Sequence, residues 1–195
     1  MKDNVILTDV DGVLLNWEYA FAVWMEQHGF EAVPGGALNY KIGERYNISN
    51  NQGHKLIKMF NESAAIGFLP PLRDAMHYVK LLHEKHGYVF HAITSLSLDP
   101  NAGKLREMNL KKLFGETVFE KVVCLDTGAD KDDALEKYRG TECFWVEDKP
   151  ENALLGHELG LKSIIMEHGH NMYYHHDNIP VVKNWREVYD IVTGQ

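Results

Sequence analysis

Residues 6–13 read Ile6-Leu7-Thr8-Asp9-Val10-Asp11-Gly12-Val13. A short apolar run that gives way to two carboxylates and a glycine indicates a buried strand ending in a tight turn. Asp9 and Asp11 then lie where loops leave the edge of a sheet, which is where open α/β sheets bind their ligands. Two aspartates can also form a simple turn with Asx-type hydrogen bonds, but two carboxylates ending a buried strand are costly without partners or a metal. We therefore expect both side chains to be functional.

The composition bounds the fold and the partners. The chain has 195 residues, an apolar content of 45% and a formal net charge of -8, which favours one domain or one domain with a small insertion. The acidic balance argues against a nucleic-acid polymer as partner, because that binding needs clustered Lys and Arg. A small phosphorylated substrate is compatible if a bound cation supplies positive charge.

The same sequence indicates a cellular compartment. No signal peptide precedes the first strand and no apolar run has the length of a membrane span, so we expect a cytoplasmic protein with no membrane partner. Cys124 and Cys143 both lie in apolar runs and fit no metal-ligand spacing. They are therefore expected to be reduced core residues rather than a disulfide.

Predicted strands and helices alternate along the chain. Apolar runs predict further strands at 88–93, 119–125, 143–146 and 161–166, and amphipathic patterns predict helices at 16–28, 72–86, 101–109, 132–138, from 149 onward and at 184–192. Residues 31–66 differ, with a loop at Pro34-Gly35-Gly36 and a helix from Ser49 to Ala65 but no evident strand. We predict a core domain of residues 1–15 and 67–195, with a small helical cap of residues 16–66 inserted after the first strand.

Four of the predicted strands end at chemically useful side chains. These are Asp9 and Asp11 after the first strand, Thr94 and Ser95 after the second, Lys131 after the third, and Glu147 and Asp148 after the fourth. The carboxyl ends of parallel strands share one edge of a sheet, so these groups should converge there. Taken singly, Thr94 and Ser95 are equally well explained as a helix N-cap, and Lys131 is better explained as a solvated surface lysine.

In this order the four groups resemble the four motifs of the haloacid dehalogenase superfamily. Its members are mostly magnesium-dependent phosphohydrolases built on a Rossmann-like, three-layer α/β fold with a parallel sheet. The first motif, Asp-x-Asp-Gly-Val, stands here as residues 9–13 and is the most specific. The resemblance covers nearly the whole chain, and it implies an α/β core with a cap and a phosphatase activity.

A narrower resemblance is to the 5'(3')-deoxyribonucleotidases of that superfamily. It rests on Asp-Gly-Val-Leu-Leu-Asn-Trp at 11–17, Phe-Leu-Pro-Pro-Leu at 68–72, and Glu-Asp-Lys-Pro at 147–150, which is similar to that family's Asp-Asp-Arg-Pro. Leu96 replaces the family's proline, Glu147 replaces the first acid of its fourth motif, and residues 39–42 offer no equivalent of its base-holding tryptophan. The resemblance implies a nucleoside monophosphate as substrate, and another metabolite such as a sugar phosphate remains the alternative.

The chemistry assigns a role to each residue. A carboxylate that attacks a phosphomonoester forms an aspartyl-phosphate, and Asp9 is the expected nucleophile, with Asp11 as general acid and base. A cation must offset repulsion between carboxylates and phosphate, and Mg²⁺ suits oxygen ligands. We expect Asp9, Asp148 and the backbone carbonyl of Asp11 to hold it, with Glu147 bound through water.

Other side chains should contact the substrate. Thr94 and Ser95 would donate hydrogen bonds to phosphate oxygens, and Lys131 would neutralise charge on the transferring group. Trp17 follows Asp11 closely enough to face the substrate. A non-catalytic phosphate-binding module, and phosphoryl transfer to an acceptor other than water, remain open alternatives.

A second cluster of titratable residues lies near the end of the chain. Glu167-His168-Gly169-His170 and His175-His176-Asp177 could suggest a transition-metal site. Their spacing matches no helical ligand motif, and the segment follows a strand in a loop that contains Gly and Asn. We predict a surface loop near the edge of the sheet that carries the site.

Overall fold

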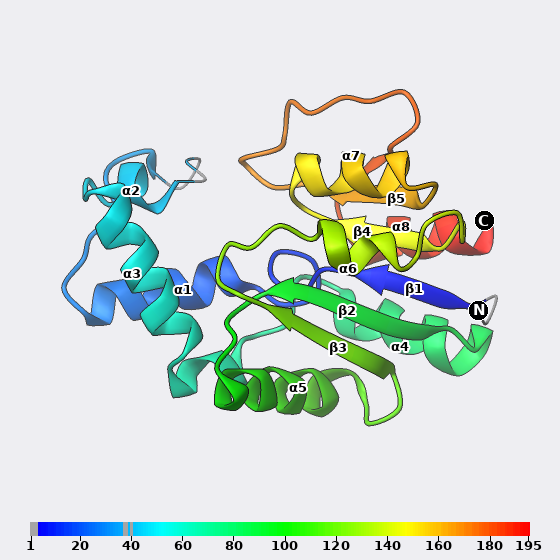
Figure 1. Cartoon of the computed structure of the whole chain (residues 1–195), viewed down its shortest axis with the longest axis horizontal. Coiled ribbons are helices and arrows are strands. Elements are labelled where there is room, and N and C mark those ends of the chain that lie inside the picture. Colours follow the sequence, from blue (N-terminus) through cyan, green and yellow to red (C-terminus); the bar gives the residue numbers. More distant parts are fainter. Residues whose placement is uncertain (1–3, 37–38, 40) are drawn as a thin grey trace.

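A computed structural model describes residues 4–36, 39 and 41–195 (Figure 1). Residues 1–3 of the predicted core and residues 37, 38 and 40 of the predicted cap therefore lie outside the described residues. The described chain contains a six-stranded sheet with the order β3-β2-β1-β4-β5-β6, in which each neighbouring pair is parallel. The strands are β1 (Val5–Thr8), β2 (Val89–Ser95), β3 (Phe119–Leu125), β4 (Phe144–Glu147), β5 (Lys162–Met166) and β6 (Val181–Val182).

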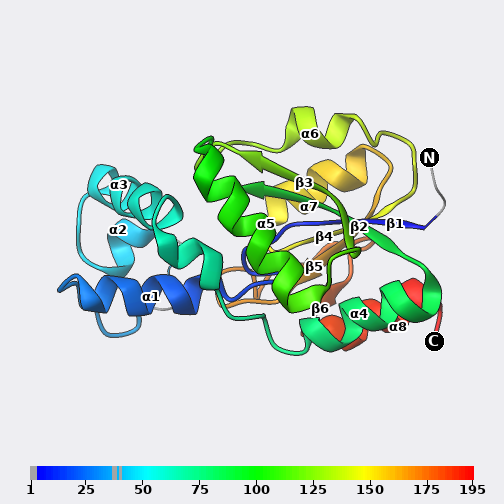
Figure 2. The ribbon, with the colours of Figure 1, turned by 90° about the horizontal axis from the view of Figure 1, so that it is seen from below.

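Helices cover both faces of the sheet (Figure 2). Helices α4 (Ala75–His86), α5 (Pro100–Phe114) and α8 (Trp185–Thr193) lie on one face, and α6 (Asp132–Glu136) and α7 (Pro150–Glu158) lie on the other. In β1, Ile6 joins the apolar cluster of the first face, whereas Val5 and Leu7 join the cluster of the second. This alternation follows from the two-residue repeat of a strand that is buried on both faces. The predicted three-layer α/β fold is confirmed.

The segment between β1 and β2 carries three further α-helices beyond the carboxyl end of the sheet (Figure 1). They are α1 (Trp17–Gln27), α2 (Ile42–Arg45) and α3 (Asn50–Asn61), followed by the 3₁₀-helix η2 (Ala64–Phe68). Phe21 of α1 and Phe60 of α3 are fully buried, with ring centroids 5.4 Å apart. The chain leaves and returns through adjacent segments, because Leu72 N donates to Leu14 O at 2.8 Å and Asn16 N donates to Pro70 O at 2.9 Å.

Several predicted boundaries were wrong for local reasons. The helix predicted at 49–65 ends at Asn61, because Ser63 adopts an extended conformation and caps the 3₁₀-helix with its hydroxyl. The helix predicted at 101–109 continues to Phe114, whose side chain is buried together with Leu110. Helix α2 and strand β6 were not predicted, because elements of four and two residues are too short to show a periodic pattern.

Two further expectations concern the cysteines and the membrane. Among the described residues, neither Cys124 nor Cys143 takes part in a disulfide, as predicted, but each is only half-buried rather than part of the closed core. Within the described residues, no helix combines the length and the apolar character that crossing a membrane requires.

Candidate active site

The turn after β1 lies in direct contact with the acidic turn after β4, which carries Asp148. Asp9 is fixed by its backbone, because its N–H donates to Val146 O at 2.8 Å, and its carboxylate accepts from Val10 N at 2.7 Å. Gly12 has a φ of 77°, and a Cβ at this position would lie 2.4 Å from Asp148 Oδ2. Glycine is therefore required here both for the backbone conformation and for the close approach of the acidic turn after β4.

Lys131 lies between two carboxylates in the interior. It follows β3 and immediately precedes α6, and only 2% of its surface is exposed. Its Nζ lies 2.8 Å from Asp9 Oδ1 and 2.8 Å from Glu147 Oε2. Burial opposes its positive charge, but Asp9 and Glu147 outweigh that cost and raise the pKa of Lys131 above its ordinary value. Lys131 is therefore a charged member of the site and not a solvated lysine.

Glu147 is completely buried and has its acceptor positions filled. Oε1 accepts from Asp148 N at 2.9 Å and from Lys149 N at 3.1 Å, and Oε2 accepts from Lys131 Nζ at 2.8 Å and Asn152 Nδ2 at 3.0 Å. Burial alone would raise the pKa of Glu147, but Lys131 and these hydrogen bonds lower it to about 2. A carboxylate has about four acceptor sites, so protein donors already occupy those of Glu147.

The carboxylates are crowded. Oxygen atoms from Asp9, Glu147 and Asp148 all lie within 4.8 Å of one another. Burial and then the neighbouring Glu147 raise the pKa of Asp9 to about 8, despite the opposing effect of Lys131. Burial, Glu147 and Asp9 likewise raise the pKa of Asp148 well above its ordinary value. Three carboxylates facing one ammonium group form an oxygen-rich, electron-rich cluster that suits a divalent cation.

Thr94 and Ser95 at the end of β2 have different surroundings. The Thr94 side chain is buried, and its Oγ1 has no hydrogen-bond partner among the described residues. Ser95 Oγ donates to Ala129 O at 2.7 Å and so ties β2 to the loop before Lys131. A buried hydroxyl without a partner is unfavourable, so Thr94 is suited to donate a hydrogen bond to a ligand in the pocket.

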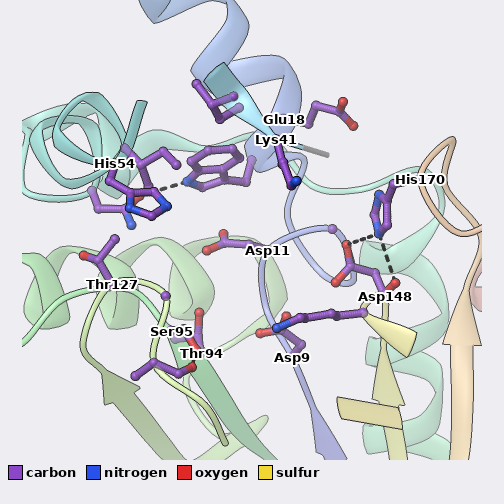
Figure 3. A pocket seen from close by; sticks show the side chains of 18 of the residues that line it. Asp9, Asp11, Glu18, Lys41, His54, Thr94, Ser95, Thr127, Asp148 and His170 are labelled. Carbon is purple, nitrogen blue, oxygen red and sulfur yellow. Dashed lines mark hydrogen bonds and ion pairs between the residues drawn. The ribbon is translucent and has the colours of Figure 1, made fainter. Parts of the chain in front are cut away.

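These groups form the floor of one cavity of about 760 Å³. Figure 3 shows Asp9, Thr94 and Ser95 on one side of the cavity, with Lys41 and His54 from the α1–α3 segment opposite them. All eight residues predicted for the site line this cavity, namely Asp9, Asp11, Trp17, Thr94, Ser95, Lys131, Glu147 and Asp148. The convergence predicted from four strand ends is therefore what the structure shows.

Trp17 is held in a fixed orientation in the cavity wall. Its Nε1 donates to Asn61 Oδ1 at 2.9 Å, and Asn61 Nδ2 in turn donates to Leu96 O at 2.9 Å. The indole also stacks on Phe21, with ring centroids 4.6 Å apart. Asn61 therefore links helix α3 to the loop that follows Thr94 and Ser95. Sequence reasoning gave no role to Asn61.

Arg106 was also missed. It lies on α5 with no exposed surface, and its Nη1 and Nη2 donate to the two oxygens of Asp11 at 2.5 Å and 3.0 Å. In the sequence, Arg106 resembles the other basic residues of an amphipathic helix. No local pattern distinguishes a buried arginine from a solvated one, so this contact could not be read from the sequence.

The histidine-containing loop lies beside the site, as predicted, but it is more than a surface loop. His168 Nε2 is hydrogen-bonded to Gly12 O at 2.6 Å, and burial lowers the pKa of His168 although that carbonyl opposes the effect. Asn171 Nδ2 donates to Asp148 O at 2.7 Å, and His170 Nε2 lies 3.1 Å from the same oxygen. Figure 3 shows His170 directly beside Asp148. The loop thus positions the two acidic turns.

No family model matches the sequence. One curated relative is an uncharacterised 32.4 kDa protein from the Gp30-rIII intergenic region of Enterobacteria phage T4. It is 30% identical over 141 residues, which cover 68% of this chain and 50% of the relative. The chain therefore spans about half the length of this relative.

Solved structures of haloacid dehalogenase-like hydrolases share the fold. One, from Streptococcus pneumoniae, has a TM-score of 0.66 at 15% identity and covers 100% of both chains. CbbY from Rhodobacter sphaeroides in complex with phosphate has a TM-score of 0.60 at 17% identity, covering 95% of this chain and 96% of CbbY. A HAD-hydrolase from Bacillus subtilis bound to magnesium has a TM-score of 0.61 at 12% identity, covering 97% of this chain and 98% of that chain. At these identities the likeness establishes the fold.

Proposed function

We propose that this protein is a magnesium-dependent phosphatase that hydrolyses small phosphomonoesters through an aspartyl-phosphate. The observation that carries the proposal is the contact between Asp9 and Lys131 on the floor of the cavity, at 2.8 Å. Asp11, Thr94 and Asp148 line the same cavity. A nucleophile, an acid–base group, a hydroxyl donor and a cation are the groups that phosphoryl transfer requires.

In the first step, an Asp9 carboxylate oxygen attacks phosphorus. The new bond joins that oxygen to phosphorus, the bond between phosphorus and the ester oxygen breaks, and Asp11 gives its proton to the departing oxygen. Lys131 neutralises charge on Asp9, and the Thr94 hydroxyl, which has no hydrogen-bond partner among the described residues, donates to a phosphate oxygen. The products of this step are the alcohol and a phosphorylated Asp9.

The second step regenerates the protein. Asp11, now a carboxylate, takes a proton from a water molecule whose oxygen attacks phosphorus. The bond between phosphorus and Asp9 breaks, which releases inorganic phosphate and restores the Asp9 carboxylate and the protonated Asp11. Transfer to an acceptor other than water would use the same first step and differ only here.

The acidic cluster fits a divalent cation. Asp9 and Asp148 would supply carboxylate oxygens, and the backbone carbonyl of Asp11 is the third expected protein ligand. Because protein donors already fill the acceptor sites of Glu147, we propose that it acts mainly by holding Lys131, with contact to the ion through water. Bound Mg²⁺ would offset repulsion between the carboxylates and the phosphate and stabilise the charge that develops during transfer.

The α1–α3 segment is proposed to act as the predicted cap and to select the substrate. Our leading candidate substrate is a nucleoside monophosphate, supported by the cavity volume of about 760 Å³ and by the fixed indole of Trp17 in its wall. A sugar phosphate is the second candidate. This candidate is supported by the fold that the protein shares with CbbY. A mutant of CbbY was solved in complex with xylulose-1,5-bisphosphate, and its structure matches this chain with a TM-score of 0.60.

The proposal is tested by measuring phosphate release from an aryl phosphate, with Mg²⁺ and with EDTA. We expect Mg²⁺-dependent turnover that Asp9→Asn abolishes while the circular dichroism spectrum stays unchanged. Asp133→Asn is the matched control, because Asp133 is exposed on α6. Turnover retained by Asp9→Asn would contradict the assignment. A protein that binds phosphate but never releases it from an ester would instead be a non-catalytic binding module.

A panel of substrates separates the two candidate classes. It should compare 5'- and 3'-nucleoside monophosphates, in ribo and deoxyribo forms, with sugar monophosphates and bisphosphates. A higher kcat/KM for deoxyribonucleotides is expected from the narrower resemblance. A preference for sugar phosphates would make that class the proposed substrate, and the proposed chemistry at Asp9 would stay the same.

A further inference from the structure

The ion pair between Arg106 and Asp11 has a defined geometry. The Arg106 guanidinium is fully buried, whereas 22% of the Asp11 side chain is exposed and lines the cavity. Nη1 donates to Oδ1 at 2.5 Å and Nη2 donates to Oδ2 at 3.0 Å. The guanidinium therefore contacts the carboxylate from the protein side, and the carboxylate lies between the arginine and the cavity.

A bidentate contact of this kind constrains orientation as well as charge. The guanidinium is planar and rigid, and two parallel hydrogen bonds fix both the plane and the rotation of the carboxylate. Each carboxylate oxygen has two acceptor positions, so one hydrogen bond to each oxygen leaves a second position on each. Because Asp11 lines the cavity and is partly exposed there, these remaining positions are available to a ligand in the cavity.

Stability alone does not account for this arrangement. A buried ion pair is often no more stabilising than apolar side chains of similar volume. Arg106 also leaves its own Nε without a hydrogen-bond partner among the described residues, which is a further cost. The contact that the protein maintains at this cost is the one that orients Asp11.

We propose that Arg106 is a positioning residue for proton transfer by Asp11. Its two hydrogen bonds hold the carboxylate at the angle at which Asp11 exchanges a proton first with the departing ester oxygen and then with the attacking water. Arg106 acts through Asp11, because it has no exposed surface from which to contact a substrate. This inference rests on the proposed function, since it assumes that Asp11 is the acid–base group.

The role predicts a particular dependence on the leaving group. An alkyl ester, such as a sugar or nucleoside phosphate, releases a strongly basic oxygen and needs a proton from Asp11. A nitrophenyl ester releases a weakly basic oxygen and needs little assistance. Loss of the orientation of Asp11 should therefore slow the cleavage of alkyl esters much more than the cleavage of nitrophenyl esters.

The experiment measures release of the alcohol or phenol in a single turnover, with protein in excess over substrate and Mg²⁺ present. For Arg106→Met we expect the rate of alcohol release from an alkyl phosphate to fall on the order of 10- to 100-fold. The rate for nitrophenyl phosphate and the substrate affinity should change little. Arg106→Lys should recover part of the loss, because one ammonium can hold one oxygen but not both. An equal loss for both esters, or no loss for either, would overturn the proposal.

Two controls distinguish a loss of positioning from a general effect of misfolding. Arg139→Met removes an exposed bidentate pair with Glu136, at 2.7 and 2.8 Å, and should leave both esters unaffected. The second control adds Arg106→Met to Asp11→Asn, so that no carboxylate is left unpaired. In this background Arg106→Met should cause no further change in the ratio of the alkyl ester rate to the nitrophenyl ester rate. A further fall in that ratio would mean that Arg106 does not act through Asp11.

Failure of the proposed function would look different. If the unmodified protein releases no phosphate, or if Asp11→Asn itself does not slow alkyl esters selectively, then the acid–base assignment of Asp11 fails first. If Asp11→Asn shows the selective loss and folded Arg106→Met does not, then only the role of Arg106 is wrong. Should Arg106→Met not fold, the same comparison is made with Arg106→Lys.

Discussion

Lys131 Nζ lies 2.8 Å from Asp9 Oδ1 and at the same distance from Glu147 Oε2, with almost none of the lysine exposed to solvent. This one ammonium group joins the ends of three strands, since Asp9 follows β1, Lys131 follows β3 and Glu147 ends β4. It is therefore both a structural link and the charge that stabilises the buried carboxylate of Asp9, the proposed nucleophile. Its removal should affect stability and activity together.

For Lys131→Met we expect the free energy of unfolding to fall by about 3–5 kcal/mol, because the change leaves buried carboxylates without their partner. Phosphate release should fall by on the order of 100-fold or more, since the charge on the transferring group loses its neutralising cation. Chemical denaturation and initial rates measure the two effects. Lys137→Met, at an exposed position near the end of α6, is the control. A fully active, fully stable Lys131→Met would contradict the assigned role.

Gly12→Ala should weaken Mg²⁺ binding and activity. The new methyl group would lie 2.4 Å from Asp148 Oδ2, so the carboxylate that we propose as a metal ligand would have to move. Gly29→Ala is a matched control because Gly29 has a φ of 80°, close to the 77° of Gly12, but no atom lies within 4 Å of the added Cβ. Both variants bear the backbone strain, and only Gly12→Ala should raise the Mg²⁺ concentration required for half-maximal activity. Equal effects in the two variants would show that the contact with Asp148 is unimportant.

Asn171→Ala tests whether the loop after β5 positions Asp148. The Asn171 side chain donates to Asp148 O at 2.7 Å and to Met166 O at 2.8 Å, and it accepts from His168 N at 2.8 Å. Loss of these buried hydrogen bonds should lower the free energy of unfolding by about 1–3 kcal/mol. It should also weaken Mg²⁺ binding, measured by calorimetry. Asn178→Ala, at an exposed position, should do neither. Unchanged metal affinity in a folded Asn171→Ala would reject the positioning role.

The carboxylate cluster should make stability depend on pH when the metal is removed. The folded-state pKa of Asp9 is raised to about 8 from an ordinary 3.8, so the folded protein binds the proton more tightly than the unfolded chain does. Stability should therefore be lost as pH rises between about 4 and 8. In EDTA, Asp9→Asn should be more stable than the unmodified protein, by a margin that grows from pH 5 to pH 8.

Mg²⁺ should reverse this trend, because an ion bound as proposed would favour the carboxylate form of Asp9 and would bind tightly only to the folded state. Denaturation curves at several pH values, with EDTA and with MgCl₂, measure both effects. A margin that shrinks as pH rises in EDTA would contradict the raised pKa of Asp9.

Much of the fold could be predicted from the sequence because the relevant signals are local. The strand at Phe119–Leu125 was predicted with its exact bounds, and Gly87 ends α4 in the left-handed conformation that its type favours. Most of the residues on the cavity floor were also predictable, because they stand at, or a few residues after, the end of an apolar run. Parallel strands bring such ends to one edge whatever the details of packing.

The remaining features depend on contacts between distant parts of the chain. Arg106 is 95 positions from Asp11, and His168 is 156 positions from Gly12. Neither residue differs in its local sequence from a solvated one, and its role appears only when α5 and the loop after β5 are packed against the turn after β1. Glu147 likewise reads as a metal ligand in sequence, but its four hydrogen bonds are visible only in the folded site.

The central claim is that Asp9 becomes phosphorylated during turnover. The direct measurement is to mix the Asp11→Asn variant with an aryl phosphate and Mg²⁺, quench in acid, and locate the added phosphoryl group by peptide mass spectrometry. Asp11→Asn should accumulate the intermediate, because the aryl ester phosphorylates Asp9 without an acid while hydrolysis lacks its base. We predict a phosphoryl group on Asp9 that disappears when Asp9→Asn is added to this variant. A phosphoryl group on another residue, or steady-state turnover by Asp9→Asn alone, would contradict the account.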